Sequence, residues 1–439
     1  MVSGLFSGPQ PRFYYGWVIV GLCFCNLAVA FGLWYSFSVF YLAVMKDFGW
    51  SRGSAASIFS VFVFCNAFTS PLAGRLLDRF GPRLVMPAGA VLLSAALVLV
   101  SFTQSLWFFR VSYGILAGVG VSLMGFTTNS ALLSRWFERR RGAAVGVAFA
   151  GIGIGMMALT PLAERWITAF GWRGAYLCLA GLVAGVIIPL NLFLARPNPQ
   201  SMGLELEGGG QGNGKKRKQI RWEVEVLDPA WAAKPWTLAA AVRTRPFWLL
   251  MLAYCCSSFC YQSTLMHAAS AMVDSGLTVQ VAAVYLGLVG IFSSGGKVLF
   301  GALSDRLGRE LTTLLTVCIC TLGMLSLIFI SPQLAILALT FAFLFGFGYG
   351  GATPIYPAAA ADLFMGGSFG LIFAVIFLGT GVGGAIGPYV SGLLRDATGS
   401  YFLTLSICLV SLWVSIVLLW KSAPGKVRRM VRTQVNPSL

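Results

Sequence analysis

Long stretches without charged residues alternate with short polar segments along most of this chain. Each of eleven such stretches, one of which holds a single Lys, exceeds the about 20 residues that a helix needs to cross a membrane. One of them, Leu311–Ala361, would be more than about 70 Å long as a single helix, so we expect it to turn back at Ser331-Pro332-Gln333. The pattern therefore predicts an all-α membrane protein with twelve transmembrane helices. The eleven stretches are Gly16–Met45, Gly53–Gly74, Leu84–Phe109, Val111–Ser134, Gly142–Ala163, Gly174–Ala195, Pro246–Val273, Ser275–Ser304, Leu311–Ala361, Leu363–Leu394 and Ala397–Trp420.

The composition agrees with a membrane protein and excludes other classes. Hydrophobic residues make up 57% of the 439 residues and charged residues only 10%, whereas a soluble domain carries about 25% charged residues. This excludes a soluble enzyme, a secreted disulfide scaffold and a disordered protein. All ten cysteines lie in apolar stretches without the spacing of a metal site, so we expect small buried side chains, no metal site and no cofactor.

The net charge of +17 would fit a nucleic-acid-binding protein if the basic residues formed one face. They lie instead between the apolar stretches. If both termini are cytoplasmic, 24 Lys and Arg residues lie on the cytoplasmic side and five on the other side. This bias follows the positive-inside rule. We therefore expect a multi-pass protein of a bacterial inner membrane or a plasma membrane, with both termini in the cytoplasm and no nucleic-acid partner.

The two halves of the chain repeat the same landmarks. Asp47-Phe48-Gly49 recurs as Asp274-Ser275-Gly276, a shift of 227 residues. The segment Gly74–Gly81 recurs at the same shift as Gly301–Gly308. Such a repeat predicts two six-helix halves with a central site between them. We divide the chain into an N-terminal half (1–195), a polar cytoplasmic linker (196–245), a C-terminal half (246–421) and a cytoplasmic tail (422–439).

Both copies of the second landmark resemble the signature loop of the major facilitator superfamily, Gly-x-x-x-Asp-Arg-x-Gly followed by a basic residue. Arg110-Val111-Ser112-Tyr113-Gly114 resembles the second motif of that superfamily. Three further segments resemble the monocarboxylate transporters and the oxalate–formate antiporters within it. They are Trp136–Gly146 followed by Ala150-Gly151, the run from Gly348 to Phe364, and the run from Gly387 to Tyr401. The resemblance covers both halves and implies the fold of these transporters.

The two signature loops have a mechanical interpretation. An Asp at the end of one helix can accept hydrogen bonds from the start of a neighbouring helix and pair with a nearby Arg. We expect such contacts to hold the two halves together on the cytoplasmic side while the outside is open, and to break when the cytoplasmic side opens. The residues concerned are Asp78, Arg79, Asp305 and Arg306.

Lys297 is the most distinctive candidate for a binding residue. It lies seven residues before the cytoplasmic end of its stretch, and a Lys inside the membrane costs about 2.5–3.5 kcal/mol on insertion scales. All fourteen Asp and Glu residues fall in loops or at helix ends, so no carboxylate of the protein lies mid-span as its counter-ion. An anionic substrate could take that role, with Ser293 one helical turn away. The alternative is that Lys297 extends to the membrane surface or binds backbone carbonyl groups.

The resemblance adds site candidates. In the monocarboxylate transporters the position of Lys297 is similar to an Arg that binds the carboxylate. An Asp of that family is replaced here by Ser293, which leaves the family's usual proton relay without its acid. Tyr35 aligns with a Lys of vertebrate members, and Asn129 aligns with an Asn of the family. Helices 1, 4, 7 and 10 line the cavity in this superfamily, which implies ligand contacts, with packing as the alternative, for Tyr35, Asn129, Tyr261, Tyr349 and Tyr356.

Two further residues are candidates for ion coupling. His267 is the only histidine, and an imidazole with its ordinary pKa of about 6.5 suits proton uptake near the outer end of its helix. Arg110 is the only other cation besides Lys297 inside the apolar region. Polar contacts between helices are the alternative role for both residues.

We predict a secondary active transporter, and not an enzyme, that carries a small monocarboxylate such as lactate or pyruvate by alternating access. Lys297 would hold the carboxylate, proton symport is the expected coupling, and we expect a monomer in the lipid bilayer. One alternative is an anion exchanger of the oxalate–formate type, although the eleventh helix lacks the second cation that oxalate would need. The other alternative is a sensor that binds its ligand without moving it.

Overall fold

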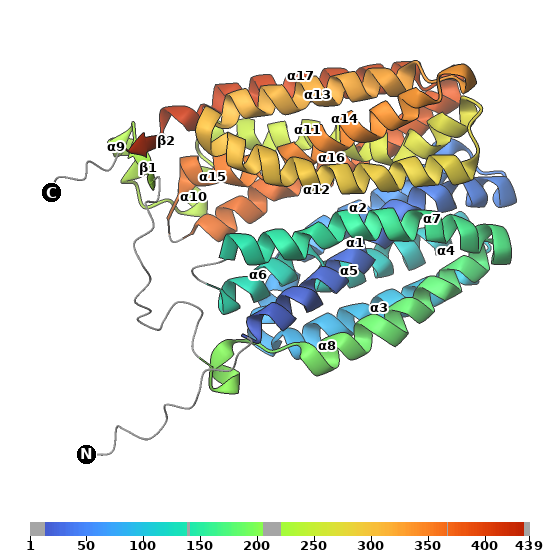
Figure 1. The fold of residues 1–439 in the computed structure, drawn as a ribbon, viewed down its shortest axis with the longest axis horizontal. Coiled ribbons are helices and arrows are strands. Elements are labelled where there is room, and N and C mark those ends of the chain that lie inside the picture. Colours follow the sequence, from blue (N-terminus) through green and yellow to red (C-terminus); the bar gives the residue numbers. More distant parts are fainter. Residues whose placement is uncertain (1–13, 138–140, 205–220, 367, 434–439) are drawn as a thin grey trace.

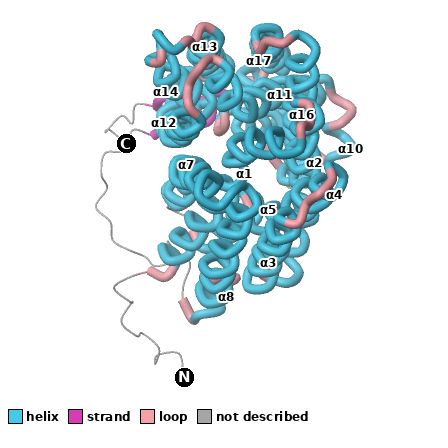
Figure 2. Tube along the Cα trace, turned by 90° about the vertical axis from the view of Figure 1, so that its right-hand side faces the viewer, coloured by secondary structure: helices cyan, strands magenta, loops and turns pink. Residues whose placement is uncertain are grey.

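The computed structural model describes residues 14–137, 141–204, 221–366 and 368–433. Its long helices run side by side in two bundles, one from each half of the chain (Figure 1, Figure 2). Eleven helical stretches of the described chain are long and apolar enough to cross a membrane. One of them, Ala144–Leu194, has 51 residues and bends at Gly171, whose φ of 71° interrupts the helix, so it crosses twice. The predicted twelve transmembrane helices are confirmed.

The N-terminal bundle holds the first six crossings. The fourth crossing is irregular, because it contains a π-helical segment and breaks at Gly125 (φ −91°, ψ −146°). A Cβ at Gly125 would lie 2.5 Å from the carbonyl oxygen of Val121, so the break requires glycine. The elements are α1 (Gly16–Phe48), α2 (Arg52–Phe80), α3 (Pro82–Ser101), α4 (Leu106–Phe109), the π-helix η1 (Arg110–Ala117), α5 (Gly118–Met124), α6 (Phe126–Trp136), α7 (Arg141–Leu182), the π-helix η2 (Val183–Ile187) and α8 (Ile188–Leu194).

The C-terminal bundle repeats the N-terminal one at the shift found in the sequence. Helices α2 and α12 begin and end 227 residues apart, and so do α3 and α13. Their caps repeat as well: the hydroxyls of Ser51 and Thr278 each accept a hydrogen bond from the backbone N–H three residues later. The elements are α11 (Arg245–Asp274), α12 (Val279–Leu307), α13 (Arg309–Ile328), the 3₁₀ turn η4 (Pro332–Leu334), α14 (Ile336–Ala352), α15 (Ile355–Phe364), α16 (Phe369–Thr398) and α17 (Phe402–Ser422).

Short elements gather at one end of the two bundles, which we call the linker end. We call the other end of the bundles the opposite end. Here β1 of the linker pairs antiparallel with β2 of the tail, from Arg221↔Thr433 to Val226↔Arg428 (Figure 1). The predicted helical fold thus carries one small sheet that joins linker and tail. The elements are η3 (Pro199–Met202), β1 (Arg221–Val226), α9 (Pro229–Ala232), α10 (Leu238–Ala241), η5 (Pro424–Lys426) and β2 (Arg428–Thr433).

Glycines let the two bundles approach each other along two seams. At the opposite end, a Cβ on Gly392 of α16 would lie 2.8 Å from the Cα of Gly53 on α2. In the middle of the membrane helices, a Cβ on Gly290 of α12 would lie 2.7 Å from the carbonyl oxygen of Gly153 on α7. Helices α7 and α12 lie side by side in both ribbon views (Figure 1, Figure 2). A larger side chain at either seam would force the backbones apart.

Candidate functional site

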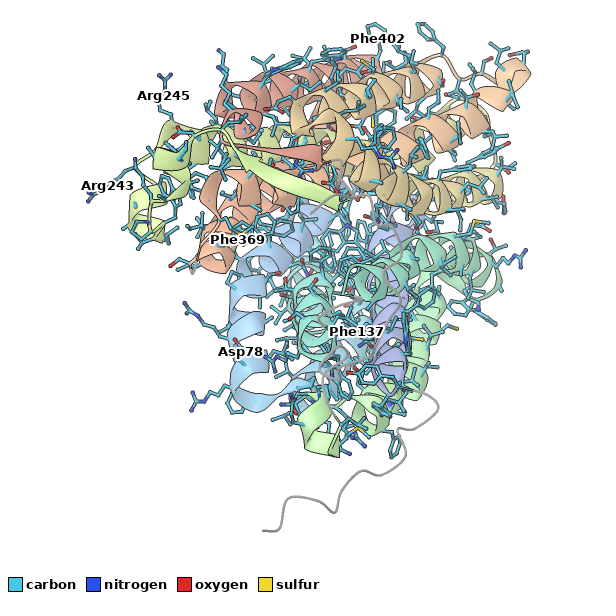
Figure 3. All side chains as sticks on the ribbon, turned by 60° about the vertical axis from the view of Figure 1, so that its left-hand side comes forward. Asp78, Phe137, Arg243, Arg245, Phe369 and Phe402 are labelled. Atoms are coloured by element: carbon cyan, nitrogen blue, oxygen red, sulfur yellow. The ribbon has the colours of Figure 1, made fainter. Side chains whose placement is uncertain are left out.

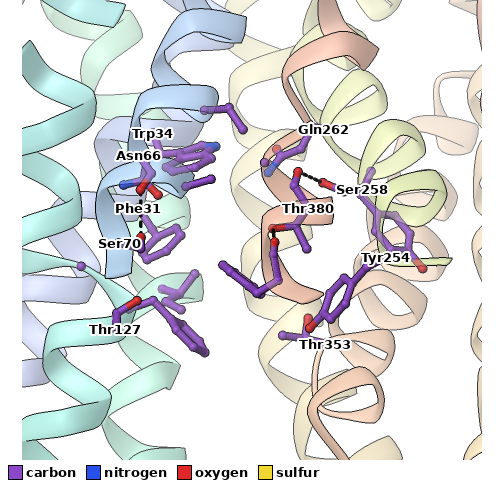
Figure 4. Close-up of a pocket in the computed structure, with 18 of the residues that line it drawn as sticks. Phe31, Trp34, Asn66, Ser70, Thr127, Tyr254, Ser258, Gln262, Thr353 and Thr380 are labelled. Atoms are coloured by element: carbon purple, nitrogen blue, oxygen red, sulfur yellow. Dashed lines mark hydrogen bonds between the residues drawn. The ribbon is translucent and has the colours of Figure 1, made fainter. Parts of the chain in front are cut away.

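A central cavity of about 190 Å³ lies between the two bundles. Figure 4 shows Phe31, Trp34 and Thr127 of the N-terminal half on one side and Gln262 and Tyr254 of the C-terminal half on the other. Helices α1, α2, α5, α6 and α7 supply one wall, and α11, α12, α14, α15 and α16 supply the other. The site therefore lies where the sequence repeat predicts it, at the interface of the halves.

Lys297 of α12 lines this cavity and is the only charged side chain among the described residues that do. The helix turns this residue inward because its neighbour Gly296 packs against α14, where a Cβ would collide with the carbonyl oxygen of Phe347. No hydrogen bond or ion pair joins the Lys297 ammonium group to any residue in the described ranges. The cavity thus holds one positive charge, and the described lining residues hold no negative charge.

All four predicted tyrosines line the same cavity. The hydroxyls of Tyr35 on α1 and Tyr349 on α14 are 2.8 Å apart, which forms a hydrogen bond between the two halves. The ring of Tyr261 on α11 lies 5.1 Å from that of Tyr349. Tyr356 on α15 stacks on Tyr254 on α11, with 4.3 Å between ring centroids. The tyrosines give the cavity an aromatic wall with polar edges.

Asn129 and Ser293 do not line the cavity. Asn129 is fully buried inside the N-terminal bundle, where its amide donates to the carbonyl oxygens of Met124 and Gly125 at 2.7 and 2.6 Å. Both carbonyl groups lie at the helix break, and that of Gly125 also accepts from the backbone N–H of Asn129 at 3.2 Å. Ser293 lies between α12 and α14, and its hydroxyl donates to the carbonyl oxygen of Gly290 at 3.0 Å. Both side chains are satisfied by backbone groups.

Asn129 belongs to a buried asparagine cluster that the sequence analysis missed. Asn26 and Asn191 exchange two amide hydrogen bonds of 2.9 and 2.7 Å, and Asn26 also donates to Asn129 at 3.4 Å. All three side chains are fully buried. The signal was present in the sequence, since each Asn lies in an otherwise apolar stretch. A polar residue in a membrane helix needs a partner on another helix.

Contacts between the halves concentrate at the opposite end, where Arg52 of α2 is central. Its guanidinium group donates to Asp274 of α11 at 2.9 Å and to the hydroxyl of Tyr401 at 2.6 Å. The carboxylate of Asp396 accepts from the backbone N–H groups of Arg52 and Gly53 at 3.0 and 2.8 Å. An anion at the first N–H groups of a helix is stabilised by the helix dipole. We call Arg52, Asp274, Asp396 and Tyr401 the opposite-end latch.

His267 lies beside this latch and not in the cavity. Its Nδ1 is 3.3 Å from the Tyr401 hydroxyl, and its Nε2 is 2.9 Å from the carbonyl oxygen of Pro388. Because a carbonyl only accepts, Nε2 carries the proton, and the neutral imidazole accepts from Tyr401 at Nδ1. The ring of Tyr41 on α1 packs edge-on against it at 5.5 Å. Arg110 lies elsewhere, on η1, and donates to the hydroxyl of Ser57 on α2 at 2.9 Å.

The signature loops lie at the linker end, where Figure 3 shows Asp78 at the surface of the N-terminal bundle. Asp78 pairs with Arg135 of α6, and Arg79 lies over the ring of Phe80. The predicted pairing of the loop Asp with a nearby Arg is present here within one half. In the C-terminal half, Arg309 bonds Asp305 at 2.8 Å and Asp362 at 2.9 Å, with Arg306 beside them in the same loop.

The distribution of these contacts defines the access to the cavity. The opposite end is closed by the latch and by the contact of Gly53 with Gly392. At the linker end, the ion pairs Asp78–Arg135, Asp305–Arg309 and Asp362–Arg309 each stay within one half. A Cβ added to Gly370, near the linker end of α16, would meet no atom within 4 Å. Among the described residues, the hydrogen bonds and ion pairs that close one end of the site are those of the opposite-end latch.

Comparison with known proteins assigns the family. Residues 22–379 match the family model described as Major Facilitator Superfamily. The chain belongs to this superfamily. Monocarboxylate transporter 13 of Bos taurus is 28% identical over 398 residues, which cover 90% of this chain and 86% of that protein. Monocarboxylate transporter 3 of Rattus norvegicus is 37% identical over 177 residues, which cover 40% of this chain and 36% of that protein.

A solved structure supports the same fold. The crystal structure of a bacterial homolog of the human lysosomal transporter Spinster, in an inward-facing and unoccupied conformation, matches with a TM-score of 0.65 at 16% identity. The match covers 95% of this chain and 97% of that one. This major facilitator protein is therefore a multi-pass membrane transporter similar to the monocarboxylate transporters.

Proposed function

We propose that this major facilitator protein carries a monocarboxylate across a cell membrane and that Lys297 binds the carboxylate. The observation that carries the proposal is the Lys297 ammonium group in the central cavity, which has no ionic partner among the described residues. The positive-inside bias supports a cytoplasmic linker end, with both termini in the cytoplasm. The cavity then faces the cytoplasm in this conformation.

The energetics favour a single carboxylate. A unit charge 4 Å from the ammonium group gains about 4 kcal/mol at an effective dielectric constant of 20. That free energy corresponds to a dissociation constant of about 1 mM, which suits a carrier of abundant metabolites. A dicarboxylate would leave one charge without a partner in a cavity whose described lining offers one cation. The names of the relatives point to the same substrate class.

Transport would proceed by alternating access. The opposite-end latch has to open to admit substrate from outside, which breaks the contacts of Arg52 with Asp274 and Tyr401. The signature loops with Asp78, Arg79, Asp305 and Arg306 would then close the linker end. In this scheme each half would move as a rigid body and keep its internal ion pairs, such as Asp78–Arg135 and Asp305–Arg309.

We infer that proton coupling acts through His267. Tyr401 accepts from Arg52 and donates to His267, so a protonated imidazole would add a second donor and a second cation at the same hydroxyl. The other groups around this site are Tyr41, Asp274 and Asp396. Protonation from the outside therefore weakens the latch and favours the outward-open state. Arg110 bonds within its own half and is not used in this scheme.

Anion exchange is the second candidate for coupling. The described residues that line the cavity include no Asp, Glu or His, so no lining side chain offers a carboxylate or imidazole proton site. An exchanger needs none, because one anion returns in place of the other. Counterflow without a pH gradient, compared with uptake driven by a pH step, separates the two modes. His267→Gln should abolish the stimulation by external acid in a symporter and leave counterflow unchanged in an exchanger.

The decisive experiment is uptake into proteoliposomes from a panel of mono- and dicarboxylates. We expect Lys297→Ala to abolish saturable carboxylate uptake and Lys297→Arg to keep part of it, because Arg keeps the charge. Lys421→Ala, at the end of α17, is the matched control and should transport normally. A neutral sugar or an amine that competes better than every acid would overturn the proposal. Binding of the acids without flux would assign a sensor.

A further inference from the structure

Aromatic rings, and not only Lys297, shape the central cavity. Phe31 stacks on Trp34 with 5.6 Å between centroids on the N-terminal side. Tyr254 stacks on Tyr356 on the C-terminal side, and Phe377 lies beside Tyr254 at 5.8 Å. An apolar cavity of about 150 Å³ is large enough to hold benzene. The cavity measured here, about 190 Å³, therefore has room for a ring in addition to a carboxylate.

The cavity is also longer than a two- or three-carbon acid. Along α11 it is lined from Tyr254 to Gln262, a span of eight residue steps that rises about 12 Å at 1.5 Å per residue. Lactate or pyruvate bound at Lys297 would leave most of these walls in contact with water. Aromatic walls release their water when a flat apolar group fills the space between them. The shape and the lining both favour a substrate with a ring.

Two buried polar atoms on residues that line this cavity lack a hydrogen-bond partner among the described residues. They are the indole Nε1 of Trp34, whose side chain is 6% exposed, and the amide Oε1 of Gln262. Figure 4 shows these two residues facing each other across the cavity, toward the opposite end. Neighbouring hydroxyls are satisfied: Ser258 donates to the carbonyl oxygen of Thr380 at 2.8 Å. A buried donor and a buried acceptor without partners are costly unless a ligand satisfies them.

From these observations we propose that the substrate is a monocarboxylate that bears an aromatic ring with a polar substituent. The carboxylate pairs with Lys297, and the ring lies between the stacked pairs Phe31–Trp34 and Tyr254–Tyr356. The substituent accepts from Trp34 and donates to Gln262, which a phenolic hydroxyl or a heterocyclic nitrogen can do. This inference rests on the proposed function, and it replaces the lactate-sized substrate with a larger class.

Calorimetric titration of the purified full-length protein tests the substrate class by binding alone. The probes are propionate, 3-phenylpropionate and 3-(4-hydroxyphenyl)propionate at neutral pH. Each buried methylene group strengthens binding about fourfold, so we expect the phenyl acid to bind at least about 30-fold more tightly than propionate. The hydroxyphenyl acid should bind about 5- to 10-fold more tightly still, through its hydrogen bonds at the far end.

Variants assign the two polar contacts. Gln262→Leu and Trp34→Phe should each remove most of the advantage of the hydroxyphenyl acid over the phenyl acid while leaving phenyl-acid binding within about threefold. Trp107→Phe is the matched control, since Trp107 is 70% exposed and lies outside the cavity. Lys297→Ala should weaken all three acids. Circular dichroism and thermal unfolding show whether each variant is folded before its binding is interpreted.

The outcomes separate this inference from the proposed function. Lys297-dependent binding of propionate that equals binding of the phenyl acids overturns the ring-bearing substrate and leaves a small monocarboxylate carrier. An advantage of the hydroxyphenyl acid that survives in both Gln262→Leu and Trp34→Phe refutes the two polar contacts. Binding that is unaffected by Lys297→Ala refutes the proposed function and the inference together.

Discussion

The two ends of the molecule are built from similar residues and hold the halves together in different ways. At the opposite end, Arg52 of one half bonds Asp274 and Tyr401 of the other half. At the linker end, the corresponding Arg–Asp pairs, Asp78–Arg135 and Asp305–Arg309, each lie within one half. The same chemistry thus joins the halves at the opposite end, whereas the pairs Asp78–Arg135 and Asp305–Arg309 at the linker end do not.

This difference teaches that the position of an ion pair relative to the interface decides its role. A pair within one half stabilises that half in every conformation. A pair across the interface stabilises one conformation only, so it contributes to the equilibrium between the two access states. The predictions below compare contacts between the halves with contacts inside one half, from the largest expected effect to the smallest.

The largest effect should come from the glycine seam between α7 and α12. Gly153→Val places side-chain atoms against the backbone of Gly290 and the hydroxyl of Ser294. Such overpacking costs about 1–3 kcal/mol. We therefore expect the conformation in which α7 and α12 touch at this seam to be disfavoured about 5- to 150-fold, and transport to fall accordingly. Gly21→Ala is the control, because nothing lies within 4 Å of its Cβ position.

The readout is alkylation of a cysteine placed at Thr353, a residue that lines the cavity, in a chain whose native cysteines are replaced by alanine. A membrane-impermeant maleimide is added from either side. Gly153→Val should increase labelling by maleimide added on the side of the opposite end, and Gly21→Ala should not. Equal labelling of the two variants would show that this seam does not control access.

Removal of the latch cation should have the next largest effect. Arg52→Ala removes two charge-assisted hydrogen bonds between the halves. Because the Arg52–Asp274 pair is partly exposed, we expect a total net loss near the lower end of the about 1.5–3 kcal/mol that hydrogen bonds to charged groups contribute. We expect the equilibrium between the two access states to shift at least about tenfold toward the state open at the opposite end, measured by labelling of the same cysteine at position 353. Arg173→Ala is the matched control. Arg173 bonds Asp47 at 2.8 Å at the same end, but within one half.

The control sharpens the comparison of the two kinds of ion pair. Arg173→Ala should lower the unfolding temperature slightly and leave labelling from both sides unchanged. A shift in access as large as that of Arg52→Ala would mean that any loss of charge at this end opens the cavity. The latch would then have no special role.

Neutralisation of the linker-end loops should change access least among the charge variants. Asp78→Asn and Asp305→Asn remove ion pairs that lie within one half. We expect labelling of the cavity cysteine to stay within about twofold, because partly exposed pairs contribute about 0–1 kcal/mol. Turnover should fall more than access, since the loops are needed in the other conformation. A strong loss of labelling from the linker side would contradict this assignment.

The smallest effect concerns a helix cap that takes no part in access. Thr278→Ala removes the hydroxyl that accepts from the N–H of Val281 at the start of α12. A lost N-cap costs about 1 kcal/mol, so thermal unfolding should shift by a few degrees while access and transport stay unchanged. A change in access would show that the start of α12 also contributes to the closure of the opposite end.

Much of the fold could be predicted from the sequence because the membrane limits the choices. Backbone groups in hydrocarbon must be satisfied within helices, so uncharged stretches report helices directly. The repeat at 227 residues identified the two halves, and α2 and α12 follow it residue for residue. Lys297 could be singled out because an unpaired charge in such a stretch is rare. The helix break at Gly125 could not be seen, since a lone glycine has many uses.

The candidate site was harder to predict than the fold. Alignment suggested Asn129 and helical spacing suggested Ser293 as ligand contacts, yet both bond backbone groups away from the cavity. His267 was a candidate for proton coupling, with a polar contact between helices as the alternative, and its contact with Tyr401 joins residues 134 positions apart. Helical periodicity gives a residue's face only relative to its own helix. Which neighbour that face meets depends on the packing of all twelve crossings.

The sequence by itself determined the twelve crossings, the two related halves and the presence of one unpaired cation within the apolar stretches, because each follows from the cost of placing polar groups in hydrocarbon. Only the tertiary structure decided which side chains share the cavity with Lys297 and which ion pairs cross between the halves. Those facts depend on contacts between segments hundreds of residues apart, such as Arg52 with Tyr401. Close packing fixes such contacts, and no local pattern in the chain records them.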